Sequence, residues 1–145
     1  MVQTNYLYDS GWVMKAAGLI GASAAVATVI DTGSATANVK GEIIIDITAI
    51  EIDTSNEIYD IVLQGTNTAA FATDTDIVDL CSMTFADDAV QRTDCNRVST
   101  IGRYIMRFTN EYNGTCYRYL RLYTIVAGTI GSGGINYSAY ASIDK

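Results

Sequence analysis

Histidine and proline are both missing from the 145 residues of this chain. Histidine is the commonest general base and the commonest metal ligand in proteins, so its absence removes the usual catalytic triads and many metal sites. Ser132 stands between Gly131 and Gly133, but it lacks the frame of a nucleophile elbow and has no histidine to activate it. No lysine follows these glycines, so they do not form a phosphate-binding loop motif. We therefore expect a protein that is not an enzyme.

Cysteine is scarce. Cys81, Cys95 and Cys116 are irregularly spaced and include no CxxC pair, so they predict neither a disulfide framework nor a zinc site. We expect reduced thiols in a cytoplasm and no cofactor, and the sequence leaves a bridge between Cys81 and Cys95 open.

Long hydrophobic runs are also lacking. Residues 16–30 are largely apolar, but they are too few for a membrane span and include Gly, Ser and Thr. Residues 22–24 have the small side chains of a cleavage site, yet too few strongly apolar residues precede them for a signal peptide. We expect this stretch to supply a strand of small residues, and we expect no membrane partner.

Basic residues are outnumbered, with nine Lys and Arg against 16 Asp and Glu and a net charge of −7, which argues against nucleic acid as a partner. Twelve acids and one base lie between Glu42 and Asp94, whereas five bases and one acid lie between Cys95 and Ile125. If the two segments occupy different faces, one copy offers an acidic and a basic patch for head-to-tail association. The alternative is two ordinary solvated surfaces.

One acidic loop gathers carboxylates in the middle of the chain. Its spacing, D-x-D-x-x-D, loosely resembles a calcium loop, but the required glycine and the closing glutamate are missing. A solvated loop is therefore favoured over a cation site, and no two acids are marked out as a glycosidase pair. The acids concerned are Asp74, Asp76, Asp79, Asp87 and Asp88.

Alternating apolar and polar residues predict most of the chain as β-strands. In 42–52 the alternation slips near Ala49 and Ile50, which indicates a bulge or burial on both faces. Residues 53–56 are a turn that would join this strand to 57–64 as a hairpin, while 77–99 are hard to interpret. The turn signals and the lack of a long amphipathic helix predict an all-β fold, an antiparallel β-sandwich or jelly roll. The expected strands are 24–31, 42–52, 57–64, 103–109, 116–127 and 135–143.

The most regular alternation lies in residues 116–127, CYRYLRLYTIVA. We expect this strand to pair back along 103–109 through a turn at 110–114. One face carries apolar residues suited to a core, Leu120, Leu122 and Val126. The other carries large side chains with polar ends, suited to a half-exposed contact surface: Tyr117, Tyr119, Arg121 and Tyr123.

The first residues show no periodicity, so we expect 1–23 to be an irregular N-terminal arm and 24–145 to be the sandwich domain. Tyr6, Tyr8 and Trp12 lie among polar residues of this arm. Buried aromatic residues often anchor interfaces, so they are candidates for docking on a neighbour. The equally weighted alternative is that they pack on their own domain.

Several of these stretches together resemble the small capsid cement proteins of tailed bacteriophages. The resemblance rests on VIDTG at 29–33, the strand 58–65 with a following loop that contains Phe71, RYLRLY at 118–123, the glycine-rich turn 128–134 and the final strand to Ile143. It implies a jelly-roll-like homotrimer that is assembled in the host cytoplasm. Such a protein sits on the outer surface of the virion head, where it clamps capsomers of the major capsid protein.

From this resemblance we expect a non-enzymatic virion structural protein whose partners are its own copies and the phage major capsid protein. The contact residues would be the tyrosine and arginine row of 117–123, Arg103 and Arg107, with Tyr6, Tyr8 and Trp12 as anchors. The alternative is a receptor- or carbohydrate-binding sandwich of a phage tail or cell surface, because exposed aromatic residues serve sugars as well as proteins.

Overall fold

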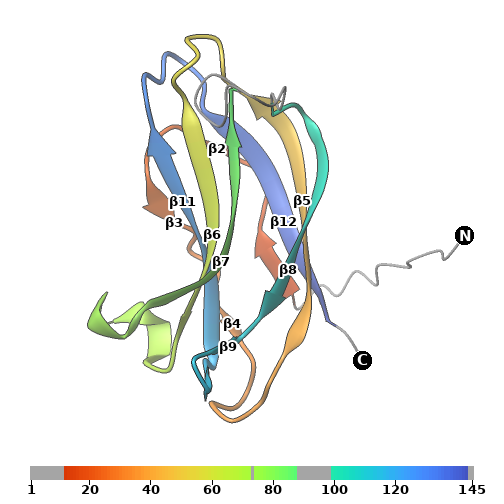
Figure 1. The fold of residues 1–145 in the computed structure, drawn as a ribbon, viewed down its shortest axis with the longest axis vertical. Helices are drawn as coiled ribbons and strands as arrows, with labels where there is room; N and C mark the ends of the chain where they lie inside the picture. Colours follow the sequence, from red (N-terminus) through yellow and green to blue (C-terminus); the bar gives the residue numbers. More distant parts are fainter. Residues whose placement is uncertain (1–11, 73, 88–98, 144–145) are drawn as a thin grey trace, which may run out of the picture.

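The computed structural model describes residues 12–72, 74–87 and 99–143, and these form two antiparallel sheets packed face to face (Figure 1). The expected all-β sandwich is confirmed. Within the described residues, no helix has the length and apolar character needed to cross a membrane.

One sheet, called here the β12 sheet, has the order β1-β12-β5-β8, with the short β2 also paired to β12. Its strands are β1 (Val13–Lys15), β2 (Leu19–Ile20), β5 (Lys40–Ile50), β8 (Gly102–Thr109) and β12 (Ile135–Ile143). The central strands are the long β12 and β5, which run antiparallel from Ile135 opposite Ile50 to Ile143 opposite Gly41.

The other sheet, called here the β11 sheet, has the order β3-β11-β6-β7, with the short β4 also paired to β11. Two 3-10 turns, η2 (Ala69–Phe71) and η3 (Asp74–Asp76), follow β6, and a small hairpin of β9 and β10 precedes β11. The strands are β3 (Ala24–Ala25), β4 (Ile30–Asp31), β6 (Ile58–Thr66), β7 (Val78–Ala86), β9 (Glu111–Tyr112), β10 (Thr115–Cys116) and β11 (Tyr119–Ala127).

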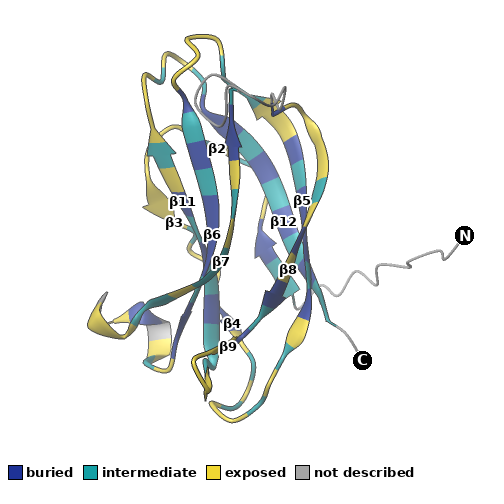
Figure 2. Ribbon diagram, viewed as in Figure 1, coloured by how far each residue is buried: buried dark blue, intermediate teal, exposed yellow. Residues whose placement is uncertain are grey.

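The core lies between the sheets, where alternate residues of each long strand point inward. Figure 2 shows buried positions along the middle of both sheets. The core face predicted for 116–127 is confirmed for Leu120 and Leu122, and Val126 packs partly buried against the same core. Residues with no exposed surface at the centre of the core include Ile43, Ile45, Tyr59, Ile61, Leu63, Leu120, Leu122, Ile135 and Tyr137.

The irregularity expected near Ala49 is a β-bulge. Ala49 lies opposite Asn136 and Ile47 opposite Tyr137, so Thr48 is the extra residue. Burial on both faces occurs in the same strand, since three successive isoleucines, residues 43–45, are 0% exposed.

Both predicted strand pairings were wrong. β5 and β6 belong to different sheets, so residues 53–56 cross from one sheet to the other instead of closing a hairpin. Likewise β8 pairs with β5 and β11 pairs with β6, and the turn at Asn113 and Gly114 closes only the small β9–β10 hairpin. Each crossing places the apolar side of one strand on one sheet of the sandwich and that of the other strand on the opposing sheet, so both contribute to the core from different sides.

The prediction of an irregular arm was wrong for the part of residues 1–23 that the structure describes. β1 and β2 both pair with β12, and residues 24–31 form the two short strands β3 and β4 on β11 in place of one strand. Residues 12–31 therefore line the edges of both sheets. β1 and β2 were missed because such short strands are held by backbone pairing, whereas periodicity reports only side-chain burial.

Candidate functional site

The two predicted arginines of β8 lie on the outer side of the β12 sheet. Arg103 makes a two-point ion pair with Asp46 of β5, with Nε and one terminal nitrogen 2.7 and 2.9 Å from the carboxylate oxygens. Arg107 lies 3.4 Å from Glu42 of the same strand, and its side chain is 88% exposed. Acidic residues of β5 thus lie beside basic residues of β8 on one face, so these parts of the two segments do not occupy different faces, and the alternative of an ordinary solvated surface holds for these pairs.

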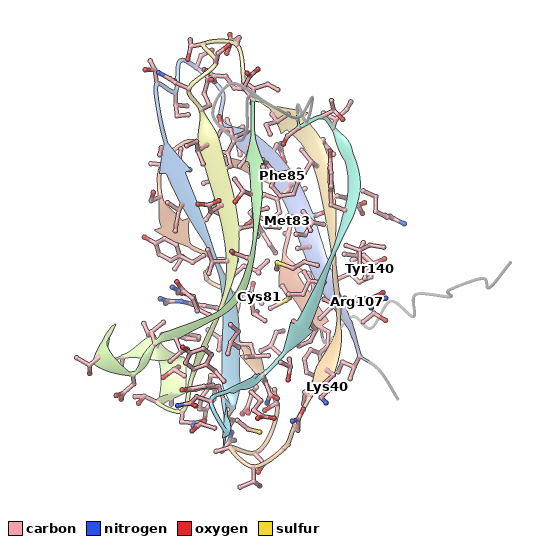
Figure 3. The ribbon with its side chains drawn as sticks, viewed as in Figure 1. Lys40, Cys81, Met83, Phe85, Arg107 and Tyr140 are labelled. Carbon is pink, nitrogen blue, oxygen red and sulfur yellow. The ribbon has the colours of Figure 1, made fainter. Side chains whose placement is uncertain are left out.

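Apolar residues run between these ion pairs. Ile105 of β8 lies opposite Ile44 of β5, and Ile44 lies opposite Tyr140 of β12. Ile44 is 0% exposed although it points away from the core, and Ile105 is 39% exposed. Figure 3 shows Arg107 and Tyr140 on this outer side. We call this surface the arginine face; it consists of Glu42, Ile44, Asp46, Arg103, Ile105, Arg107 and Tyr140.

Arg121 and its neighbours lie on the opposite side of the molecule, the outer side of the β11 sheet. Arg121 donates to the Gln64 side-chain oxygen at 3.0 Å, and its guanidinium carbon lies 4.1 Å from the centre of the Phe71 ring. Phe71 belongs to η2 and is only 7% exposed. The segment after β6 therefore folds back over this face and covers part of the row that the sequence predicted as a contact surface.

Tyr119 and Tyr123 stay on this outer side and are half-buried. The Arg118 guanidinium lies 5.1 Å from the Tyr119 ring and makes a two-point ion pair with Asp31 at 2.7 and 2.9 Å. Tyr123 lies opposite Val62 of β6 and Ala25 of β3. Both tyrosines thus already have neighbours within their own chain.

Tyr117 does not belong to the same row, which corrects the sequence prediction. The chain leaves β-structure between β10 and β11, and Gly65 lies opposite the core residue Leu120. A side-chain carbon on Gly65 would stand 2.9 Å from Cβ of Tyr117 and 3.0 Å from Leu80. Tyr117 is therefore on the core side of the sheet, and Gly65 leaves the space for it.

Of the predicted anchors, Trp12 packs partly buried against the core of its own chain. The own-domain alternative therefore holds for this residue. Tyr6 and Tyr8 lie outside the described residues. The predicted contact residues accordingly fall into two groups on opposite outer faces, together with Tyr117 and Trp12 inside or at the edge, and they do not form one site.

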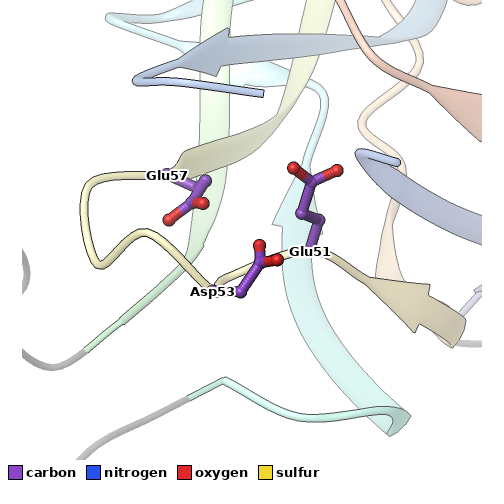
Figure 4. Close-up of side chains that lie close together, drawn as sticks. All are labelled: Glu51, Asp53 and Glu57. Atoms are coloured by element: carbon purple, nitrogen blue, oxygen red, sulfur yellow. The ribbon is translucent and has the colours of Figure 1, made fainter. Parts of the chain in front are cut away.

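The described carboxylates of the acidic loop do not form a cluster that could hold a metal ion. Asp76 accepts a hydrogen bond from the Thr68 hydroxyl at 2.9 Å, and Asp79 accepts one from the Gln64 amide at 3.0 Å. Asp88 lies outside the described residues. A different acidic cluster, which the sequence did not suggest, consists of Glu51, Asp53 and Glu57, whose carboxylate oxygens come within 4.8 Å of one another (Figure 4).

Two carboxylates of this cluster, those of Glu51 and Glu57, accept hydrogen bonds from neighbouring loop residues. Glu51 accepts from the backbone N–H groups of Gly131 and Gly133, each at 2.5 Å. Glu57 accepts from the hydroxyl and the N–H of Thr54, at 2.6 and 2.9 Å, and from the N–H of Asn56. The Thr54 hydroxyl bond, ahead of the backbone bonds, lowers the pKa of Glu57 to about 2. These carboxylates fix the turn that carries the chain from β5 to β6.

The described cysteines, Cys81 and Cys116, are half-buried free thiols. Burial raises the pKa of Cys81 to about 11, so this thiol stays protonated and poorly nucleophilic near neutral pH. Cys95 lies outside the described residues.

A hollow of about 310 Å³ opens between the edge strands β7 and β8. The residues that line it are Met83, Thr84, Phe85, Ser99, Arg103, Tyr104 and Ile105, and this described lining includes no carboxylate. It is the open edge of the sandwich, with Phe85 and Tyr104 packed edge to face at 4.8 Å beneath it.

Comparison with known proteins adds no assignment: no protein-family model matches the chain, and no curated protein matches it.

Proposed function

We propose that this chain is a non-enzymatic virion structural protein, a cement protein that binds the outer surface of a bacteriophage head as a homotrimer and stabilises the contacts between capsomers. The observation that carries this proposal is the arginine face. It presents Ile105, 39% exposed, between Arg103 and Arg107 on the outer side of the β12 sheet.

Such a surface has the anatomy of a protein interface, with an apolar centre and a charged rim. Arg107 and Glu42 are 3.4 Å apart and the arginine is largely exposed, so this pair costs little to exchange for a pairing with a partner. A cement protein acts through many symmetric copies, so a modest area on each copy is sufficient when the copies are linked in one shell. On the outer face of the β11 sheet, by contrast, Arg121 lies against the ring of Phe71, which is only 7% exposed, so part of that face is already covered by the chain itself.

The test compares two isoleucines with the same exposure on opposite faces. Ile105 and Ile125 are both 39% exposed. We expect Ile105→Glu to abolish binding to capsids that lack their cement protein and Ile125→Glu to leave it unchanged, as measured by co-sedimentation. Raising the salt concentration should weaken binding of the unchanged chain, because the rim is charged. Equal binding by both variants would contradict the proposed role of the arginine face.

Light scattering gives the oligomeric state independently. A stable species of three times 15.6 kDa would support the trimer. A strict monomer that binds glycans and not capsids would overturn the proposal in favour of a receptor- or carbohydrate-binding module.

A further inference from the structure

Lys15 is a buried lysine, with 7% of its surface exposed, at a bulge of β1. Its ammonium nitrogen donates hydrogen bonds to the carbonyl oxygens of Ala16 at 3.0 Å, Gly18 at 2.9 Å and Tyr137 at 2.8 Å. A protonated lysine has three N–H donors, so these acceptors use all of them. The side chain therefore ends in a cage of carbonyl oxygens at the edge of the sandwich.

The ring of Tyr137 closes one side of this cage, with its centre 4.4 Å from the Lys15 nitrogen. The Tyr137 hydroxyl is paired with that of Thr124, at 2.7 Å, on the far side of the ring. Among the residues that the structure describes, the ion pairs are those of Arg103, Arg107 and Arg118, and none includes Lys15. Burial without a carboxylate partner lowers the pKa of Lys15, so carbonyl dipoles and the ring face are what hold the charge.

We propose that the carbonyl oxygens of Ala16, Gly18 and Tyr137, with the Tyr137 ring, form a binding site for a primary ammonium group. Lys15 fills it in this chain, and its occupancy holds residues 12–20 on β12. This inference goes beyond the proposed function and does not depend on it.

The position of the three carbonyl acceptors explains why an ammonium group in the site holds the N-terminal segment on β12. Ala16 and Gly18 belong to the connection between β1 and β2, whereas Tyr137 belongs to β12, so one ammonium ties the N-terminal segment to the sheet. Both N-terminal strands are short, the pairing of β1 is interrupted by a bulge, and Leu19 of β2 is 56% exposed. Without the ammonium these carbonyl groups lose a buried donor, which costs more than an exposed bond does.

The same geometry defines the ligand class. A primary ammonium supplies one N–H for each acceptor, whereas a planar guanidinium has a fixed fork and a quaternary ammonium has no N–H at all. An alcohol of the same length has a single donor and no charge. The site should therefore distinguish these groups when the lysine side chain is shortened.

The first measurement uses the unchanged chain. The protein has three lysines, Lys15, Lys40 and Lys145. Mass spectrometry after brief acetylation should show Lys15 at least tenfold less modified than Lys40, which is exposed at the start of β5. Equal modification of the two would overturn the proposal without any variant.

The second measurement is chemical rescue of Lys15→Ala by n-propylammonium, which replaces the atoms removed. Trp12 is the one tryptophan of the chain and lies in the same segment, so its fluorescence reports the attachment. We expect the variant to shift Trp12 emission to longer wavelength and to speed amide exchange in residues 13–20 at least tenfold, with β5 and β6 still protected. Millimolar n-propylammonium should reverse both changes saturably.

Two additives and two variants serve as controls. 1-Propanol and tetramethylammonium should not restore Lys15→Ala, and Lys40→Ala should behave like the unchanged chain. Lys15→Met keeps the apolar stem and should release the segment as the alanine variant does. Attachment of Lys15→Met as firm as in the unchanged chain, or rescue by 1-propanol as good as by n-propylammonium, would refute the ammonium site.

Discussion

On the outer face of the β12 sheet Arg107 stands in solvent beside Glu42, whereas on the outer face of the β11 sheet Arg121 lies against Phe71. Both faces come from strands with the same alternation of arginine and large apolar residues. The difference comes from the connections, because the segment after β6 returns over one face. Alternation determines which side of a strand faces outward, and the connections determine what remains exposed there.

The largest expected effect is alkaline unfolding, which tests whether the two sheets unfold together as one cooperative unit. Each sheet holds one buried phenol, Tyr59 in β6 and Tyr137 in β12, and mainly burial raises both pKa values to about 12. Because the pKa of each tyrosine in the folded chain lies above the usual value of 10.0, the folded state favours the neutral phenols. Their contribution to the free energy of unfolding is fully present below pH 10 and is lost as the pH rises to about 12. We expect a single alkaline transition, followed by circular dichroism and tyrosinate absorbance.

Tyr137→Phe tests the contribution of one sheet alone. It removes the phenol of the β12 sheet, so the alkaline loss should shrink while the transition stays single. Two separate transitions would mean that the faces belong to independently stable sheets.

The next effect removes the cover from the β11 face. Phe71→Ala deletes a nearly buried ring, so we expect a loss of about 3 kcal/mol in the free energy of unfolding. Arg121 should also become accessible, since the ring no longer lies against its guanidinium. Urea unfolding measures the first change, and modification of arginine by a dicarbonyl reagent measures the second. Unchanged reactivity of Arg121 would show that other parts of the chain cover this face.

A smaller effect concerns the turn that separates the two sheets. The hydrogen bonds from Thr54 and Asn56 lower the pKa of Glu57 to about 2, so its stabilising contribution is present above pH 4.5 and is lost as the pH falls toward 2. Glu57→Gln should therefore be less stable than the unchanged chain at neutral pH, with the gap closing in acid. Denaturant unfolding at a series of pH values measures this gap. A gap independent of pH would indicate that the charge of Glu57 is not involved.

The smallest effect is that of the ion pairs on the arginine face. The side chains of Arg103 and Asp46 are 57% and 32% exposed, so a double-mutant cycle with alanine should give only about 0.5 kcal/mol of coupling. The coupling should fade in 1 M salt. A value above about 2 kcal/mol would mean that this face is organised like an interior and not like a contact surface.

Much of the buried pattern was predictable from the sequence, because side-chain burial repeats every second residue in a strand. The alternation in 116–127 put Leu120 and Leu122 on the side suited to a core, and both are 0% exposed. The slip near Ala49 likewise identified the bulge. These features are local, so a local pattern reports them.

The pairing of strands and the exposure of the candidate site were not predictable in this way. Tyr117 continues the alternation of its strand, but the chain bends before β11 and turns the ring inward over Gly65. Lys15 has the chemistry of a surface residue, and only three carbonyl oxygens from two segments make its burial stable. Such outcomes depend on contacts between residues far apart in the chain, to which a window of ten residues gives no access.

β12 lies between β1 and β5 in its sheet, although it follows them both by a long stretch of the chain. During synthesis on the ribosome β1 and β5 emerge early, while the strand that joins them is not yet made. Until β12 is made, the strand edges that it will join stay unpaired, a state that favours association with other nascent chains. The central position of β12 means that this sheet is completed only after all of its other strands have been synthesised.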